Sequence, residues 1–147
     1  MKRLVLENFL PYRLNRLAAA ISREFRSVYG PHHDLTVPEW RVLATLGEYD
    51  HMGAKDIGLH SAMHKTKVSR AVRALEERRW LTRTTHPEDR REEILALTSL
   101  GKHAYSEIVP EAVLFEQQLM DGLGKEAEIV LAAIKRLEKR LDLKKSS

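Results

Sequence analysis

The sequence predicts a mostly helical protein with one small β-hairpin within residues 80–98. Two observations predict this fold class. Apolar residues recur at i, i+3, i+4 and i+7 in several segments, which is typical of amphipathic helices. In contrast, residues 80–86 and 92–98 are rich in Thr and aliphatic side chains and flank the turn sequence PEDR. This second pattern is typical of two short strands joined by a turn.

Six helices are expected in chain order. The first spans residues 9–29, carries Leu14, Leu17 and Ile21 on one face, and is expected to end at Gly30-Pro31 because proline cannot continue a helix. The others are expected at residues 36 to about 48, 54–60, 64–78, 99–120 and 125–141, with Thr98 capping the fifth helix and Pro110 kinking it.

Length and composition limit the class of protein. The 147 residues are enough for one compact domain but not for two independent cores. The chain has no cysteine, which excludes disulfides and thiolate–zinc sites. Its apolar runs are far shorter than the roughly 20 residues of a membrane span, and polar residues interrupt the N-terminal stretch too early for a signal peptide. A cytoplasmic protein without a membrane segment is expected.

The excess positive charge lies in one segment. The chain has a net charge of +4, but residues 55–91 contain 10 Lys and Arg against 5 Asp and Glu, and the rest is close to neutral. A local basic segment is the electrostatic pattern expected for a nucleic-acid partner. A solvated basic face is the alternative interpretation of the same composition.

The expected helix at residues 64–78 has two contrasting sides. Val68, Ala71, Val72 and Leu75 form a stripe suited to burial. The opposite side carries Thr66, Ser69, Arg70, Arg73 and Glu77, with Lys65 and Lys67 near the helix start. The DNA major groove admits one α-helix, and hydroxyl and guanidinium groups donate to phosphates and base edges. Double-stranded DNA is therefore the expected partner of this side, and an ordinary solvated helix is the alternative.

The hairpin adds cations next to that helix. Arg90 and Arg91 stand at its turn, where they are placed to reach a neighbouring minor groove, whose negative potential attracts arginine. Asp89 would be repelled by phosphate unless it orients an arginine through a bidentate ion pair. The alternative is a surface ion pair worth about 0–1 kcal/mol.

With these features the chain resembles the MarR family of winged helix-turn-helix transcriptional regulators. The resemblance is carried by LTVPEWRVLATL at residues 35–46, KTKVSRAVRALEERRWLTR at 65–83 and HPEDRREEILALTSLG at 86–101. The order and spacing of these stretches suit the family, and the resemblance covers nearly the whole chain.

The resemblance implies roles for particular residues. The helix at 64–78 would read DNA, Asp89 would brace the wing, Arg91 would enter the minor groove, and Arg83 would be the basic residue that opens the wing. One residue departs from the pattern: Arg79 stands where the family usually has glycine after the reading helix. A left-handed conformation at a residue other than glycine costs roughly 1 kcal/mol.

The resemblance also implies an organisation and an assembly. We expect one structural domain, with an N-terminal dimerisation helix at residues 1–34, a winged helix-turn-helix DNA-binding region at 35–98 and C-terminal dimerisation helices at 99–147. The terminal helices carry more apolar surface than a small core can cover, so a homodimer is expected. Its two reading helices would address a pseudo-palindromic operator with half-sites roughly 34 Å apart. Repression is the commoner behaviour in this family.

A small-molecule effector is a further implication of the resemblance. Family members often respond to small aromatic acids or related metabolites, as free acids or as CoA thioesters. Tyr12, Arg16, Arg23 and Trp40 lie on the elements that would line such a site, where arginine would pair with a carboxylate and the rings would stack. The alternative is structural, with Trp40 as a core anchor and the arginines solvated or bridging subunits.

Two other functions remain open at the level of the sequence. A zinc-responsive regulator is one, because His60 and His64 have i, i+4 spacing, although Ser61 stands where the zinc-protease motif has Glu. A winged-helix module that binds protein or RNA is the other. The sequence contains no glycine-rich phosphate loop and no nucleophile elbow, so we expect no enzymatic activity and no cofactor.

Overall fold

The computed structural model describes residues 1–143 in two compact units, and the second unit begins at Pro38. Residues 144–147, the end of the expected C-terminal region, lie outside the described residues. The first unit, Met1–Val37, contains a short 3-10 turn, η1 (Leu6–Asn8), and the long helix α1 (Leu10–His33).

Helix α1 ends one turn later than the sequence predicts. The expectation that Gly30-Pro31 terminates it was wrong, because the helix continues to His33 and closes on Asp34, whose φ is 50° and whose N–H donates to the carbonyl of Gly30 at 2.6 Å. Pro31 lies in the last turn, where its missing N–H removes a single intrahelical bond. Arg26 Nε donates to the carbonyl of Leu35 at 3.2 Å and ties the following chain back to the helix.

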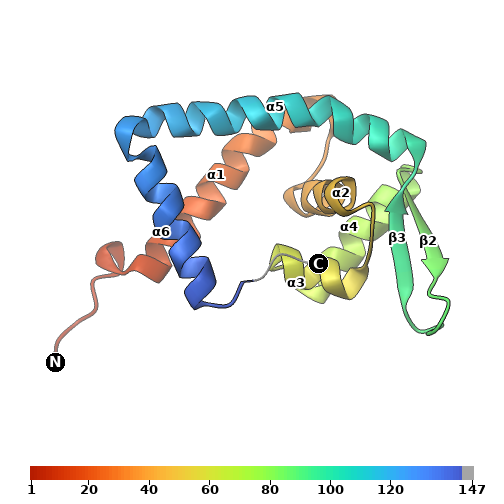
Figure 1. Cartoon of the computed structure of the whole chain (residues 1–147), viewed down its shortest axis with the longest axis horizontal. Coiled ribbons are helices and arrows are strands. Elements are labelled where there is room, and N and C mark those ends of the chain that lie inside the picture. Colours follow the sequence, from red (N-terminus) through yellow and green to blue (C-terminus); the bar gives the residue numbers. More distant parts are fainter. Residues whose placement is uncertain (144–147) are drawn as a thin grey trace. The chain divides into compact units, whose positions relative to one another are not determined.

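The second unit is mostly helical with one small sheet, which confirms the predicted fold class. Its elements are α2 (Val37–Tyr49), β1 (His51–Gly53), α3 (Ala54–Ser61), α4 (Lys65–Glu77), β2 (Leu81–Thr85), β3 (Glu93–Leu97), α5 (Ser99–Leu123), η2 (Gly124–Glu126) and α6 (Ala127–Arg140). Helix α3 lies against α4, α4 against β2, and α5 leaves from the end of β3 (Figure 1).

The sheet has three antiparallel strands in the order β1-β3-β2. The hairpin of β2 and β3 is the predicted one, and its register pairs Leu81 with Leu97 and Arg83 with Leu95. Strand β1 was not predicted. Its three residues, His51–Gly53, pair with β3 through Ala96, Leu95 and Ile94, and so short a strand has no alternation to find in the sequence.

The core of this unit joins the helix-turn-helix to the sheet. Its largest buried side chains belong to α2, α3, α4, β3 and α5, and each aliphatic one contributes about 1.5–3 kcal/mol of hydrophobic stabilisation. They are Val42, Leu43, Leu46, Ile57, Val68, Val72, Leu75, Leu95 and Ile108. This shared core fixes the orientation of α4 relative to the sheet.

The end of α4 and the start of α5 are joined by a close backbone contact. Arg79 adopts the left-handed conformation, with φ 62°, and its N–H donates to Glu76 while that of Trp80 donates to Leu75, which is a Schellman closure without glycine. Thr98 caps α5 as predicted: its hydroxyl accepts from the N–H of Gly101 and donates to the Arg79 carbonyl. A side chain at position 101 would collide with the Trp80 carbonyl oxygen.

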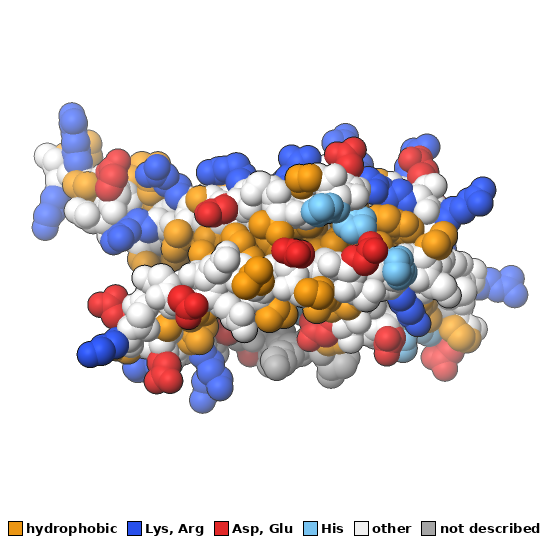
Figure 2. All heavy atoms as spheres, turned by 90° about the horizontal axis from the view of Figure 1, so that it is seen from above, with side chains coloured by type: hydrophobic (Ala, Val, Ile, Leu, Met, Phe, Trp, Pro, Cys, Tyr) orange, Lys and Arg blue, Asp and Glu red, His pale blue; other side chains and the backbone are white. Residues whose placement is uncertain are grey.

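Helices α5 and α6 leave much apolar surface exposed. Helix α5 runs through Pro110 as one element, and α6 has no buried residue. Hydrophobic side chains reach the surface on the face where α5 lies (Figure 2). The exposed large apolar residues of these helices and the residues after them are Leu100, Val113, Leu114, Leu119, Leu123, Ile129, Leu131, Ile134, Leu137, Leu141 and Leu143. None of the helices within residues 1–143 has the length and hydropathy needed to cross a membrane.

Replacing Arg79 by glycine should stabilise the protein. Glycine adopts a positive φ without strain, and the hydrogen bonds of residue 79 are backbone bonds that glycine keeps. The free energy of unfolding in a urea titration should rise by up to about 1 kcal/mol. Arg78→Gly is the matched control, because Arg78 has a helical φ of −76° and glycine there should lower stability. Equal losses in both variants would contradict the strain at Arg79.

Candidate nucleic-acid interface

Helix α4 has one buried and one exposed side, as the sequence predicts. Val68, Ala71, Val72 and Leu75 are at most 3% exposed. The residues predicted to contact DNA from this helix are all exposed, namely Lys65, Thr66, Lys67, Ser69, Arg70 and Arg73. Because the apolar stripe is held in the core, the hydroxyl and cationic side is presented outward as one surface.

The N-terminus of α4 is capped by an imidazole. His64 Nδ1 accepts a hydrogen bond from the backbone N–H of Thr66 at 3.3 Å, in the position where Ser or Asp is the usual cap. The first turn contains no acidic residue. The positive end of the helix dipole therefore adds to the charges of Lys65 and Lys67, and this turn attracts anions such as phosphate.

The cations of α4 differ in their pairing. Arg73 Nε lies 3.5 Å from Glu77 Oε1 in an i, i+4 pair whose side chains are 78% and 70% exposed. Such a pair contributes little in water and opens easily. Within residues 1–143, no ion pair engages Lys65, Lys67 or Arg70. The cationic charge available to a nucleic acid is therefore densest in the first half of the helix.

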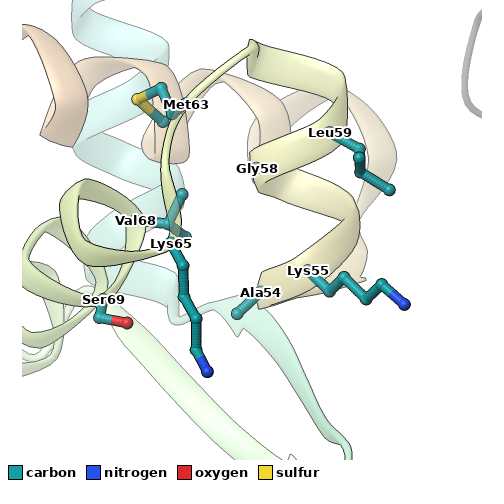
Figure 3. Close-up of a pocket in the computed structure, with 8 residues that line it drawn as sticks. All are labelled: Ala54, Lys55, Gly58, Leu59, Met63, Lys65, Val68 and Ser69. Atoms are coloured by element: carbon teal, nitrogen blue, oxygen red, sulfur yellow. The ribbon is translucent and has the colours of Figure 1, made fainter.

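A groove of about 450 Å³ lies between α3 and α4 (Figure 3). Its lining residues are Ala54, Lys55, Gly58, Leu59, Met63, Lys65, Val68 and Ser69. In Figure 3 the side chains of Lys55 and Lys65 extend outward from the two helices, while Met63 lies at the other end of the groove. Lys55 was not predicted as a site residue, although it belongs to the basic segment. It extends the cationic surface from α4 onto α3.

The turn between β2 and β3 is held by backbone hydrogen bonds. The N–H of His86 donates to Glu92 at 2.9 Å, and that of Glu92 donates to Asp89 at 3.1 Å. The Asp89 carboxylate accepts from the N–H of Arg91 at 3.0 Å, and His86 Nδ1 accepts from the N–H groups of Glu88 and Asp89. Asp89 therefore braces the turn through a backbone bond rather than through the suggested ion pair with arginine.

Both arginines at this turn, Arg90 and Arg91, are exposed. The turn thus carries two cationic side chains of its own, in addition to those of α4. The Asp89 bond holds the backbone at Arg91, so the turn fixes the position from which this side chain extends.

Arg83 lies in a different environment from the other predicted contact residues. Its Nε donates to Glu76 Oε2 at 2.7 Å, and its Nη1 donates to Glu93 Oε2 at 3.0 Å. These two ion pairs join β2 to α4 and to β3. Hydrogen bonds to the carboxylates of Glu93 and Glu76 raise the pKa of Arg83 above its usual value, so the guanidinium stays charged.

The residues expected to bind an effector are distributed over two helices. Tyr12, Arg16 and Arg23 lie on α1, and Trp40 lies on α2. The Arg16 guanidinium carbon is 5.6 Å from the centre of the Tyr12 ring, which is cation–π distance. Trp40 and Tyr12 are partly exposed, and the two arginines are exposed.

The two histidines with i, i+4 spacing have separate hydrogen bonds. His60 Nε2 lies 3.3 Å from the hydroxyl of Tyr49, and His64 caps α4. In the described part of the chain, no group of three or more His, Asp or Glu side chains is placed to hold a metal ion. The structure gives the zinc alternative no support.

The helix-turn-helix followed by a two-stranded wing defines a winged-helix protein of the kind that binds nucleic acid through its second helix. Comparison with known proteins agrees with this class, because residues 35–92 match the MarR family. An HTH-type transcriptional regulator of Bacillus subtilis (strain 168), YwoH, is 29% identical over 111 residues, which are 76% of this chain and 80% of that protein. By these matches the chain is similar to transcriptional regulators of the MarR family.

Solved structures of this family share the fold over nearly the whole chain. The regulator SPO1453 from Silicibacter pomeroyi DSS-3 is 26% identical, with a TM-score of 0.77, and the match covers 95% of this chain and 99% of that one. A MarR/EmrR family regulator from Acinetobacter sp. ADP1 is 23% identical, with a TM-score of 0.82, covering 96% and 100%.

Two further similar structures concern aromatic acids. NadR was solved in complex with 4-hydroxyphenylacetate; it is 20% identical to this chain, with a TM-score of 0.75, covering 92% of this chain and 96% of that one. The DNA binding of Bordetella bronchiseptica BpsR is regulated by 6-hydroxynicotinic acid; it is 22% identical, with a TM-score of 0.78, covering 94% and 98%. At these identities the likeness shows the fold alone.

Asp89 offers a test of how the wing turn is held. Asp89→Asn keeps an oxygen that can accept from the Arg91 N–H, whereas Asp89→Ala removes it. Amide hydrogen exchange at Arg91 should stay slow in the Asn variant and accelerate about fivefold in the Ala variant, since such a bond is worth roughly 1 kcal/mol. If both variants exchange equally fast, the carboxylate charge rather than the hydrogen bond holds the turn.

Proposed function

We propose that this protein is a sequence-specific regulator that inserts α4 into the major groove of duplex DNA. The observation that carries the proposal is the exposed surface of Thr66, Ser69, Arg70 and Arg73 opposite a buried apolar stripe. Arg70 and Arg73 have the forked geometry that donates two hydrogen bonds to guanine O6 and N7, and the hydroxyls suit phosphates or bases. Lys65 and Lys67 would meet the phosphate backbone at the helix start.

The wing supplies a second contact in this proposal. Arg90 and Arg91 at the turn would lie along the adjacent minor groove, where a narrow A/T-rich segment attracts arginine most strongly. Asp89 would act by shaping the turn, through the bond to the Arg91 N–H, rather than by touching DNA. A regulator of this family is expected in the cytoplasm, together with the DNA it binds.

A homodimer is the second part of the proposal. Helix α6 buries none of its residues within the chain, and its exposed apolar side chains include Ile134 at 44% and Leu137 at 37%. A contiguous apolar face of this kind on a single chain favours association. A second copy of the same chain is the occupant proposed, because pairing about a two-fold axis buries the face and matches a pseudo-palindromic operator.

Regulation by a small aromatic or related acid is the third part. Arg16 and Arg23 offer guanidinium groups for a carboxylate, and Tyr12 and Trp40 offer rings for stacking. The aromatic ligands of NadR and BpsR support this class of effector, as a free acid or a CoA thioester. We propose that binding represses transcription and that the effector releases the DNA. Titration of aromatic carboxylic acids into the protein–DNA complex tests this part, and no release would argue against it.

Selection of bound sequences from random duplexes should return a pseudo-palindromic site. On that site Arg70→Ala should weaken binding by about 1–3 kcal/mol and relax the preference at one base position per half-site. Lys67→Ala is the matched control, because a phosphate contact should weaken binding to all sequences similarly and lower the salt slope by about one.

Two results would contradict this proposal. Enrichment of no sequence in the selection would argue against specific DNA binding. A binding affinity that is independent of salt would argue against phosphate contacts, since the slope of log K against log salt should be about −0.9 for each phosphate neutralised. An Arg70→Ala loss that is equal on all duplexes would reassign Arg70 to a phosphate.

The dimer is tested by a charge placed on α6. Ile134→Asp should weaken self-association at least about 100-fold, because a carboxylate buried in an apolar interface is strongly unfavourable. Light scattering at micromolar concentration should then report a monomer. Leu59→Asp is the control, since Leu59 is 73% exposed on α3, away from the proposed interface, and this variant should remain dimeric. A wild-type monomer at that concentration would refute the dimer.

A further inference from the structure

We propose that Arg83 is a positioning residue that fixes the wing against the reading helix, and not a phosphate contact. The proposal rests on the function proposed above, because it assigns Arg83 a part in placing the DNA-binding elements. It differs from the role that the family resemblance implied, in which Arg83 is the basic residue that opens the wing.

The strand register places Arg83 on the side of the hairpin that faces the core. Leu81 and Arg83 alternate onto the same face of β2, and Arg83 pairs with Leu95 of β3. Leu81 and Leu95 are at most 3% exposed. Glu93 lies on the same face, diagonal to Arg83 across the ladder. The side chain of Arg83 therefore lies on the same face of the sheet as these buried leucines, further along the hairpin.

Glu76 completes the arrangement from α4. It follows Leu75 and lies one turn after Val72, so it flanks the buried stripe of the helix on the side of the hairpin. Arg83 bridges the two carboxylates with contacts of 2.7 Å to Glu76 and 3.0 Å to Glu93. One side chain thereby links the reading helix, the first strand of the wing and the second strand.

The charges in this cluster argue against a phosphate contact. One guanidinium between two carboxylates leaves a net charge of −1 beside the hairpin. A phosphate brought to Arg83 would lie beside both carboxylates, whose combined negative charge exceeds the positive charge of the guanidinium. Arg73 shows the contrast: its single contact of 3.5 Å with Glu77 is on its own helix and is 78% exposed, so it opens without moving the wing.

A double-mutant cycle with Arg91 tests the proposal. In the wild-type background, Arg91→Ala should weaken binding to the selected duplex about tenfold. In an Arg83→Gln background the same change should weaken it less than about threefold, because an unpositioned wing has already lost its contact. Arg73→Gln is the matched control, and its loss should add to that of Arg91→Ala. Thermal unfolding of each variant shows that the fold is retained.

A conservative variant gives an independent result. Arg83→Lys keeps the charge but cannot bridge two carboxylates with a planar fork. If Arg83 positions the wing, the Lys variant should bind DNA as weakly as Arg83→Gln, because neither side chain bridges both carboxylates. If Arg83 contacts a phosphate, the Lys variant should keep most of the affinity that the Gln variant loses.

The outcomes separate this inference from the proposed function. Additive losses for Arg83→Gln and Arg91→Ala, with normal wild-type binding, would overturn the positioning role and leave the DNA-binding function in place. An Arg91→Ala variant with wild-type affinity would overturn both the wing contact and the role of Arg83. Coupling between Arg83 and Arg91, together with an Arg83→Lys variant that binds as weakly as Arg83→Gln, would support the positioning role.

Discussion

The burial of one side of α4 is the constraint on which the other features depend. Val68, Val72 and Leu75 lie in a core shared with the sheet and with α5, so the helix cannot rotate without exposing them. That fixed rotation turns Ser69 and Arg70 outward. Hydrophobic packing on one side of α4 thus determines which side chains are exposed on the other side. The exposed residues supply hydrogen-bond donors and positive charge rather than stability.

The joint between α4 and α5 extends this constraint to the longer helices of the second unit. Thr98 bonds to Arg79 and Gly101 with one hydroxyl, and the absence of a side chain at Gly101 allows α5 to start against the Trp80 carbonyl. A shift at the start of α5 would therefore also displace the end of α4. The effector and the dimer partner proposed above would act on distant helices, and this contact connects those helices to α4.

Much of this arrangement was predictable from sequence, because it depends on local periodicity. The amphipathic pattern located α4, and Thr98 identified the start of α5. Other features were missed. The end of α1 is set by the left-handed conformation of Asp34, whose N–H donates to Gly30, and β1 exists only through its pairing with β3. The partners of Arg83 come from two other elements, although its alternation with Leu81 was a usable signal that it faces the core side of the hairpin.

The distribution of paired charge refines what the basic composition of residues 55–91 means. Arg83 is engaged by two carboxylates and Arg73 by one, so a count of cations overstates the charge that DNA would meet. What remains is concentrated at the start of α4 and at the wing turn, on two elements that must be held at a fixed separation to act together. The carboxylates in the basic segment are therefore not a defect of a DNA-binding surface. Glu76, and Glu93 just beyond that segment, hold this separation by binding Arg83. The positive charge of Arg83 is then not available to DNA.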